Sequence, residues 1–112
     1  MARLTLRVDL GPGKAIGPGK IRLLEAVRDS GSISRGGRAL GMSYRRAWLL
    51  IDSLNRTFRH KVVTARPGGE SGGGARLTPF GLALIARYRA IERRAQTAAT
   101  RDLATLQRAL RR

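Results

Sequence analysis

The stretch from residue 41 to 58, GMSYRRAWLLIDSLNRTF, decides the fold. Gly41 suits the end of one helix, and the hydroxyl of Ser43 suits the N-cap of the next. Apolar side chains then recur at steps of three and four residues, which predicts an amphipathic helix. They are Tyr44, Ala47, Trp48, Ile51, Leu54 and Phe58. We expect this stripe to face the core, with Trp48 buried in it.

Two arginines, Arg45 and Arg46, lie off that stripe in the first turn of the expected helix. The helix dipole disfavours cations there, so their presence indicates another role. One interpretation is a solvated helix face. The other is contact with DNA, in which arginine forks bond guanine and the hydroxyls of Ser43 and Tyr44 bond bases or phosphates.

The segments before this stretch predict a strand, a linker and two helices. Residues 3–10, RLTLRVDL, alternate apolar and polar side chains, which is typical of a half-buried strand. Residues 11–20, GPGKAIGPGK, are rich in residues that break helices and strands, and we interpret them as a linker. Helices are expected over residues 20–30 and 33–40, the second capped by Ser32.

After the stretch the pattern changes to a hairpin and a final helix. Residues 62–66 and 75–78 are the expected strands, and residues 67–74 between them hold five glycines. No Gly-Lys-Ser/Thr follows, which argues against a phosphate-binding loop. Thr78 suits the cap of a last helix, which no Gly or Pro interrupts from residue 82 to 112.

The order helix, helix, helix, hairpin, helix predicts a mainly α fold with a small β-sheet. We expect a winged helix-turn-helix with a long C-terminal helix, in one domain over residues 1–112. Its parts are an N-terminal strand at 1–10, the helix-turn-helix and wing at 18–78, and a C-terminal dimerisation helix at 79–112.

The composition favours a polyanionic partner. The 112 residues carry 23 Lys and Arg against 7 Asp and Glu, a formal net charge of +16. All but three of these cations are arginine, whose fork fits phosphate and guanine, although a GC-rich coding bias explains arginine equally well. We expect the third helix to enter the major groove of double-stranded DNA, and Arg66 and Arg76 at the base of the wing to grip phosphate.

Other classes of protein are disfavoured. The chain has no cysteine and one histidine, so we expect no metal and no cofactor, and an enzyme is the weakest interpretation. It has no apolar run of membrane-spanning length and no signal peptide, so we expect a cytoplasmic protein without membrane contact.

The last helix carries an apolar seam that slips by one position near residues 98 and 99. Its members are Leu84, Tyr88, Ile91 and Ala95 before the slip and Leu103, Leu106 and Leu110 after it. Either the helix breaks at the slip or the seam drifts around it. The seam packs on its own domain or forms a homodimer, and we favour the homodimer, which presents two reading helices about 34–36 Å apart.

Residues 18–92 resemble the N-terminal DNA-binding domain of the ModE family, which are molybdate-responsive bacterial transcription regulators. The most specific matches are Ser43-Tyr44 with Ala47-Trp48 and the glycine-run wing at residues 68–75. The helix-turn-helix alone also resembles the LysR-type regulators. The resemblance implies DNA contacts at the starts of the second and third helices and in the wing. Together with the two wing arginines, the expected DNA-contacting residues are Ser32, Ser34, Arg35, Ser43, Tyr44, Arg45, Arg46, Arg66, Ser71 and Arg76.

Three departures from the family stand out. Gly37 replaces a usual alanine, which weakens the second helix by up to about 1 kcal/mol. Leu49 occupies a position where a polar residue is expected. Full-length members continue into a C-terminal oxyanion-binding module, and we expect no molybdate-binding module in this chain.

These observations favour a sequence-specific DNA-binding transcription regulator that acts as a homodimer. The resemblance implies target genes for molybdate uptake or molybdoenzymes. One alternative is an architectural protein that binds nucleic acid by charge without reading bases. Another is a truncated regulator that forms heterodimers with a full-length one.

Overall fold

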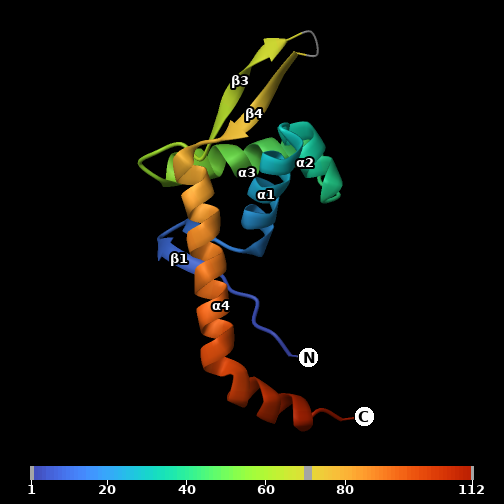
Figure 1. Ribbon diagram of the computed structural model, residues 1–112, viewed down its shortest axis with the longest axis vertical. Coiled ribbons are helices and arrows are strands. Elements are labelled where there is room, and N and C mark those ends of the chain that lie inside the picture. The colour runs from blue at the N-terminus through green and yellow to red at the C-terminus, as the bar shows by residue number, and fades with distance from the viewer. Residues whose placement is uncertain (1, 70–71, 112) are drawn as a thin grey trace.

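The computed structural model describes the backbone of residues 2–69 and 72–111 and the side chains of residues 2–66 and 74–111. Within those limits the chain is mainly helical with two small antiparallel hairpins, which confirms the predicted fold class. The elements are β1 (Val8–Gly11), β2 (Lys14–Ile16), α1 (Pro18–Ser30), α2 (Ile33–Ala39), α3 (Tyr44–Thr57), β3 (Val63–Gly69), β4 (Gly72–Leu77) and α4 (Pro79–Arg108). Figure 1 shows three short helices packed together, with β3–β4 projecting at one end and α4 running away towards the other.

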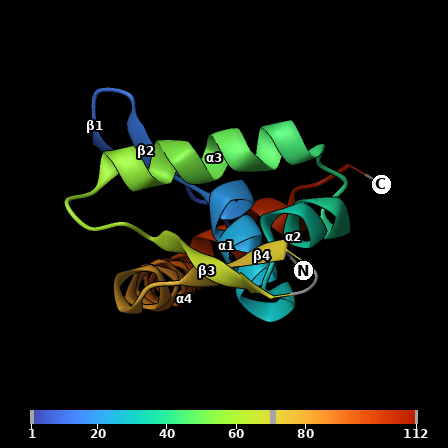
Figure 2. The same cartoon turned by 90° about the horizontal axis from the view of Figure 1, so that it is seen from above.

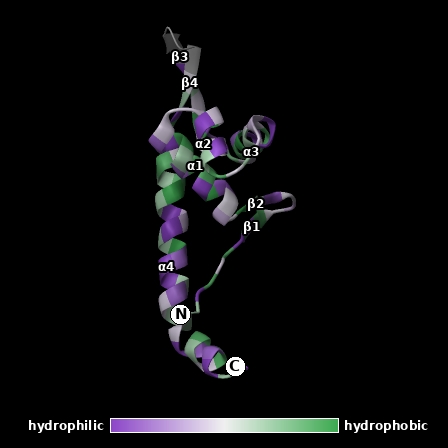
Figure 3. Cartoon of the chain, turned by 90° about the vertical axis from the view of Figure 1, so that its right-hand side faces the viewer, coloured by the Kyte–Doolittle hydropathy of each residue, from purple (hydrophilic) through white to green (hydrophobic). Residues whose placement is uncertain are grey.

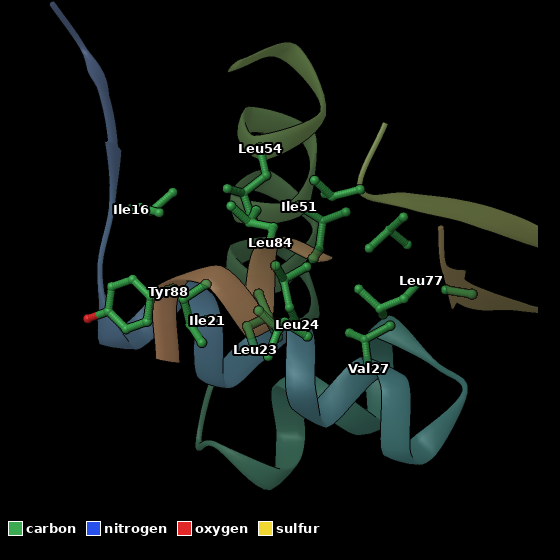
Figure 4. Close-up of a cluster of buried hydrophobic side chains, with 14 of the residues drawn as sticks. Ile16, Ile21, Leu23, Leu24, Val27, Ile51, Leu54, Leu77, Leu84 and Tyr88 are labelled. Atoms are coloured by element: carbon green, nitrogen blue, oxygen red, sulfur yellow. The ribbon is translucent and has the colours of Figure 1, made fainter. Parts of the chain in front are cut away.

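One apolar core joins the three short helices to the base of β3–β4 and the start of α4 (Figure 4). α1 supplies its centre, because Ile21, Leu23, Leu24 and Val27 are fully buried. The other buried residues are Ile16, Ala47, Ile51, Leu54, Val62, Val63, Ala75, Leu77, Leu84, Ile85 and Tyr88. Burial of each large aliphatic side chain contributes roughly 1.5–3 kcal/mol, so this cluster fixes the position of α3.

Hydroxyl side chains cap three helices where the sequence predicts them. Ser32 accepts a hydrogen bond at 3.1 Å from the amide three residues later, and Ser43 accepts an equivalent bond at 3.1 Å. Thr78 accepts one at 2.9 Å from the amide of Gly81. Gly31 ends α1 with a φ of 72°, a left-handed conformation that favours glycine. These caps set the short connections that orient α2 and α3.

The glycine- and proline-rich segment at residues 11–20 is not the linker that its composition predicts. β1 pairs with β2, and Pro12 and Gly13 form the turn between them. Gly13 has a φ of 69°, as the third residue of a type II turn requires. The rest of the segment forms β2 and begins α1, so it belongs to the folded domain.

A strand is expected over residues 3–10, but β1 begins only at Val8. The segment before it lies against α4 instead of another strand. The hydroxyl of Tyr88 donates to the carbonyl of Leu6 at 2.6 Å. The side chain of Gln96 accepts from the amide of Leu4 at 2.8 Å and donates to the carbonyl of Ala2 at 3.3 Å. A helix offers side chains rather than a ladder of backbone groups. The apolar alternation is therefore kept without strand pairing.

The second hairpin lies where the sequence predicts it, with longer strands than expected. β3 and β4 pair antiparallel, from Val63 opposite Leu77 to Gly69 opposite Gly72. The amide of Ala75 donates to the carbonyl of Gly31 at 2.9 Å, which fixes the hairpin base to the turn between α1 and α2.

α4 is one unbroken helix through residues 98 and 99, so the slip in its apolar seam is not a break. Its core contacts come from Leu84, Ile85 and Tyr88 near its start. Figure 1 shows that its last turns curve away from the first part of the helix. The far part of α4 extends beyond the core and gives the molecule principal extents of 56 × 31 × 22 Å.

Candidate nucleic-acid interface

The first turn of α3 presents four polar side chains to solvent. Ser43, Tyr44, Arg45 and Arg46 are all exposed, and Ala47 directly after them is fully buried. Figure 2 shows that α3 lies along one side of the domain, with much of its length open. The two arginines therefore lie where the sequence places them, outside the core.

Trp48 is not the buried anchor predicted from its spacing, because 46% of its surface is exposed. Tyr44, one turn earlier, is also exposed. Successive residues of a helix are about 100° apart, and the buried face of α3 consists of Ala47, Ile51 and Leu54. Trp48 is one step past Ala47, so it lies on the flank of the helix. Steps of three and four residues do not determine which of these two neighbours faces the core.

Tyr44 and Trp48 line a groove between α3 and the β3–β4 hairpin. The groove has a volume of about 390 Å³, and its far wall includes Thr64, Ala65 and Ala75. Tyrosine and tryptophan combine a large apolar ring with a polar edge, which suits contact with sugars and bases as well as phosphates. The exposed indole therefore belongs to the candidate interface.

The wing arginines, Arg66 and Arg76, are exposed but lie on a different face of the hairpin. Ala65 pairs with Ala75, and both line the groove beside α3. Side chains alternate between the two faces of a strand, so the arginines lie on the other face from these alanines, and neither arginine lines the groove. They form a second cationic surface, separate from the arginines of α3.

The predicted contacts at the start of α2 also have structural roles. Ser32 caps the helix, and Ser34 is partly buried. The guanidinium of Arg35 donates to the carbonyl of Ser30 at 2.9 Å, which ties α2 to the end of α1. Arg35 is exposed and has further N–H groups that can reach a phosphate. Ser71, also expected to contact DNA, lies outside the described residues.

Asn55 holds α3 against the hairpin, a role that the sequence analysis missed. Its Oδ1 accepts hydrogen bonds from the amides of Val62 at 2.8 Å and Val63 at 3.2 Å. Its Nδ2 donates to the carbonyl of Val63 at 3.1 Å. The available signal was an asparagine directly after the core residue Leu54, near the end of the predicted helix.

Arg89 joins α4 to α1, which the sequence analysis also missed. Its guanidinium donates to the two carboxylate oxygens of Glu25 at 2.6 and 3.1 Å and to Glu92 at 2.6 Å. Hydrogen bonds to Glu25 and then to Glu92 raise the pKa of Arg89 above its usual value, so it stays charged. Because the partner in α1 is 64 residues away in sequence, no local pattern identifies it.

The residues of the expected dimer seam divide into two groups. Leu84 and Tyr88 are buried in the chain's own core, so packing within the domain accounts for them. Leu106 and Leu110 are 68% and 70% exposed, and Figure 3 shows hydrophobic patches at that end of α4. The seam residues that lie between these two groups, Ile91, Ala95 and Leu103, are partly buried.

Among the described helices, none combines the length and the apolar character that a membrane-spanning segment needs. Over the same residues, no three His, Asp or Glu side chains come together in a group that could hold a metal ion.

Three packed helices, the exposed first turn of α3 and the adjoining hairpin define a winged helix-turn-helix protein. The family model described as "Bacterial regulatory helix-turn-helix protein, lysR family" matches residues 19–82, from α1 to the start of α4. The chain belongs to this family of DNA-binding transcription regulators.

Several relatives have names that refer to molybdenum. The molybdenum transport protein ModE of Azotobacter vinelandii is 40% identical over 101 residues, which are 90% of this chain and 37% of that protein. The molybdenum-pterin-binding protein MopB of Rhodobacter capsulatus is 48% identical over 80 residues, 71% of this chain and 30% of that protein. The DNA-binding transcriptional dual regulator ModE of Escherichia coli (strain K12) is 39% identical over 87 residues, 78% of this chain and 33% of that protein.

These similarities confirm the predicted resemblance to a ModE-type N-terminal helix-turn-helix. The chain spans about a third of the length of these relatives.

Proposed function

We propose that this protein is a sequence-specific regulator that reads double-stranded DNA with the first turn of α3. The supporting observation is the exposure of residues 43–46 in front of the buried Ala47. A guanidinium fork can bond O6 and N7 of guanine, and each such pairing contributes roughly 1–3 kcal/mol of discrimination. The net charge of +16 attracts the DNA backbone whatever its sequence.

The remaining DNA contacts fall into two sets, one in the groove beside α3 and one on the other face of the hairpin. Tyr44 and Trp48 contact the sugar–phosphate strand that passes between α3 and β3–β4. Arg66 and Arg76, on the other face of the hairpin, bind phosphates further along the duplex. In this arrangement the arginines of α3 supply specificity and the hairpin supplies affinity.

The same proposal includes a homodimer formed through the far part of α4. Leu106 and Leu110 are exposed there, and the 30 residues of α4 reach about 45 Å. In the dimer, these leucines would be buried against one another and removed from water, which favours association. A two-fold axis at that end would present two copies of α3 to successive major grooves about 34–36 Å apart.

The names of the relatives motivate the proposal for target genes. ModE of A. vinelandii is named as a molybdenum transport protein and ModE of E. coli as a transcriptional regulator. We therefore place the operators at genes for molybdate uptake or molybdoenzymes. A regulator of such genes would act in the cytoplasm, where we place the protein. Genome-wide mapping of bound sites should show enrichment at such genes, and an even distribution over the chromosome would contradict it.

Selection of binding sites from random duplexes, followed by competition at fixed salt, tests the central proposal. The protein should prefer its selected operator over random DNA by about 10³-fold or more. An architectural protein would show no such preference, although the affinity of either protein falls steeply with salt. Arg45→Gln should reduce the preference, whereas Arg22→Gln, which changes an exposed arginine on α1, should leave it intact.

A further inference from the structure

Leu49 is an apolar side chain on the exposed face of the proposed reading helix. It is 46% exposed and lies one turn after Arg45, on the face opposite to Ala47 and Leu54. The residues one turn before and after it on this face are all polar, namely Arg45, Arg46, Asp52 and Ser53. This position is where a polar residue is expected in a helix that only contacts water or phosphate.

Leu49 and Leu50 are the apolar part of a shallow hollow beside the first turn of α3. The hollow has a volume of about 280 Å³, and its remaining lining comes from Ser43, Arg45 and Arg46. It shares none of its lining residues with the groove that holds Trp48. Apolar contact is thus available next to two guanidinium groups.

The major groove of DNA offers one apolar group on its base edges, the C5 methyl of thymine. Leu49 is four residues after Arg45, or about 6 Å along the helix axis. One base-pair step is about 3.4 Å, so Leu49 reaches a base one or two steps from the base that Arg45 contacts. A leucine and an arginine at this spacing fit a thymine methyl close to a guanine.

We propose that the Leu49 hollow binds the C5 methyl of a thymine and thereby reads that base in the operator. This inference rests on the proposed function and specifies which bases the site takes. The methyl loses its contact with water against Leu49 and Leu50, while the guanidinium of Arg45 can make polar contacts and the hydroxyl of Ser43, which accepts from the amide of Arg46, can still donate its proton. Leu49 is then a specificity residue rather than an exposed side chain without a partner.

Deoxyuridine tests the inference, because it differs from thymidine only by the missing methyl. Each thymine of the selected operator is replaced in turn, and affinity is measured by fluorescence anisotropy. One or two positions should lose affinity by roughly three- to tenfold in the unchanged protein. At those positions, Leu49→Ala should bind the thymine and uracil operators equally. Leu82→Ala, which truncates a leucine of equal 46% exposure on α4, should keep the difference.

A second measurement asks whether the methyl itself is recognised. With a C·G pair at the sensitive position, 5-methylcytosine should bind more tightly than cytosine by a similar factor. The inference is overturned if no thymine-to-uracil replacement weakens binding, or if the same replacement still weakens binding of Leu49→Ala. Either result can occur while the preference for the operator remains. Absence of any preferred operator overturns the proposed function as well, so the two failures are distinguishable.

Discussion

A side-chain carbon on Gly37 of α2 would lie 2.7 Å from Cβ of Ala47 in α3. The two helices of the helix-turn-helix therefore approach so closely that one of these positions must lack a side chain. Gly37 is not a weak point in the second helix, as its low helix propensity suggests, but the residue that allows α3 to pack.

Gly37→Ala should destabilise the fold although alanine is the better helix former. The clash costs roughly 1–3 kcal/mol and outweighs a propensity gain of about 1 kcal/mol. Urea unfolding measures the difference. Gly19→Ala is the matched control, since a Cβ there would meet nothing within 4 Å, and it should be neutral or slightly stabilising. In the double variant Gly37→Ala/Ala47→Gly, the loss should be smaller than the sum of the single losses.

Loss of either arginine at the start of α3 should change which DNA is preferred. Arg45→Ala or Arg46→Ala should lower the ratio of operator to random binding, because a base contact is lost. Arg76→Ala should weaken all sequences alike and reduce the salt slope by about one. Titrations at several salt concentrations separate the two effects. An unchanged operator preference in both α3 variants would show that α3 is not the reading helix.

Asn55→Ala should loosen the junction between α3 and β3. Two backbone amides, those of Val62 and Val63, lose their acceptor, at a cost of roughly 1–3 kcal/mol for each group left unsatisfied. Asn55→Asp keeps an acceptor for both amides but puts a carboxylate oxygen where Nδ2 donated to the carbonyl of Val63, so it should recover only part of the loss. Thermal unfolding of the three proteins checks the order of stability. Equal stability of all three would mean that water replaces these bonds at no cost.

Separating Arg89 from Glu25 should weaken the attachment of α4. Their bidentate contact is partly shielded, with about a third of the arginine side chain exposed, so Arg89→Met should cost about 1–2 kcal/mol. A double-mutant cycle with Glu25→Gln isolates the pair. Arg94→Met, an exposed arginine of the same helix, should change stability by less than about 0.5 kcal/mol. A coupling energy near zero would assign the effect of Arg89→Met to other contacts.

Charge at the far end of α4 should separate the proposed dimer without unfolding the domain. Leu106 and Leu110 are exposed, so Leu106→Glu and Leu110→Glu leave the core untouched. Sedimentation should show a dimer for the unchanged protein and a monomer for the double variant. Leu82→Glu, at an exposed position near the start of α4, should remain dimeric. A monomer in the unchanged protein would rule out this seam.

The features predicted correctly are those that local sequence determines. Caps at Ser32, Ser43 and Thr78 each bond an amide three residues away, so a short window of sequence contains both partners. The order of helices and hairpin likewise follows from periodicity and from glycine runs. These patterns were enough to place Arg45 and Arg46 at the exposed start of the third helix.

The features missed depend on contacts that are distant in sequence. Trp48 was assigned to the core because periodicity alone does not show that Ala47 is the residue facing Gly37. The segment before β1 alternates like a strand, yet its partner is α4, through Tyr88 and Gln96. Neither partner can be identified from the segment itself, so its alternation predicted a strand longer than β1.

The amide of Ala2 donates to the side chain of Gln107 at 2.8 Å, which brings the first and last described segments side by side. Figure 1 shows both chain ends on the side of the molecule remote from α3. A fluorophore or an added domain joined at either terminus would therefore emerge from one common location, distant from any bound duplex. That location also holds Leu106 and Leu110 of the proposed dimer seam, so a fluorophore there would report the association of two chains while the base-reading helix stays accessible.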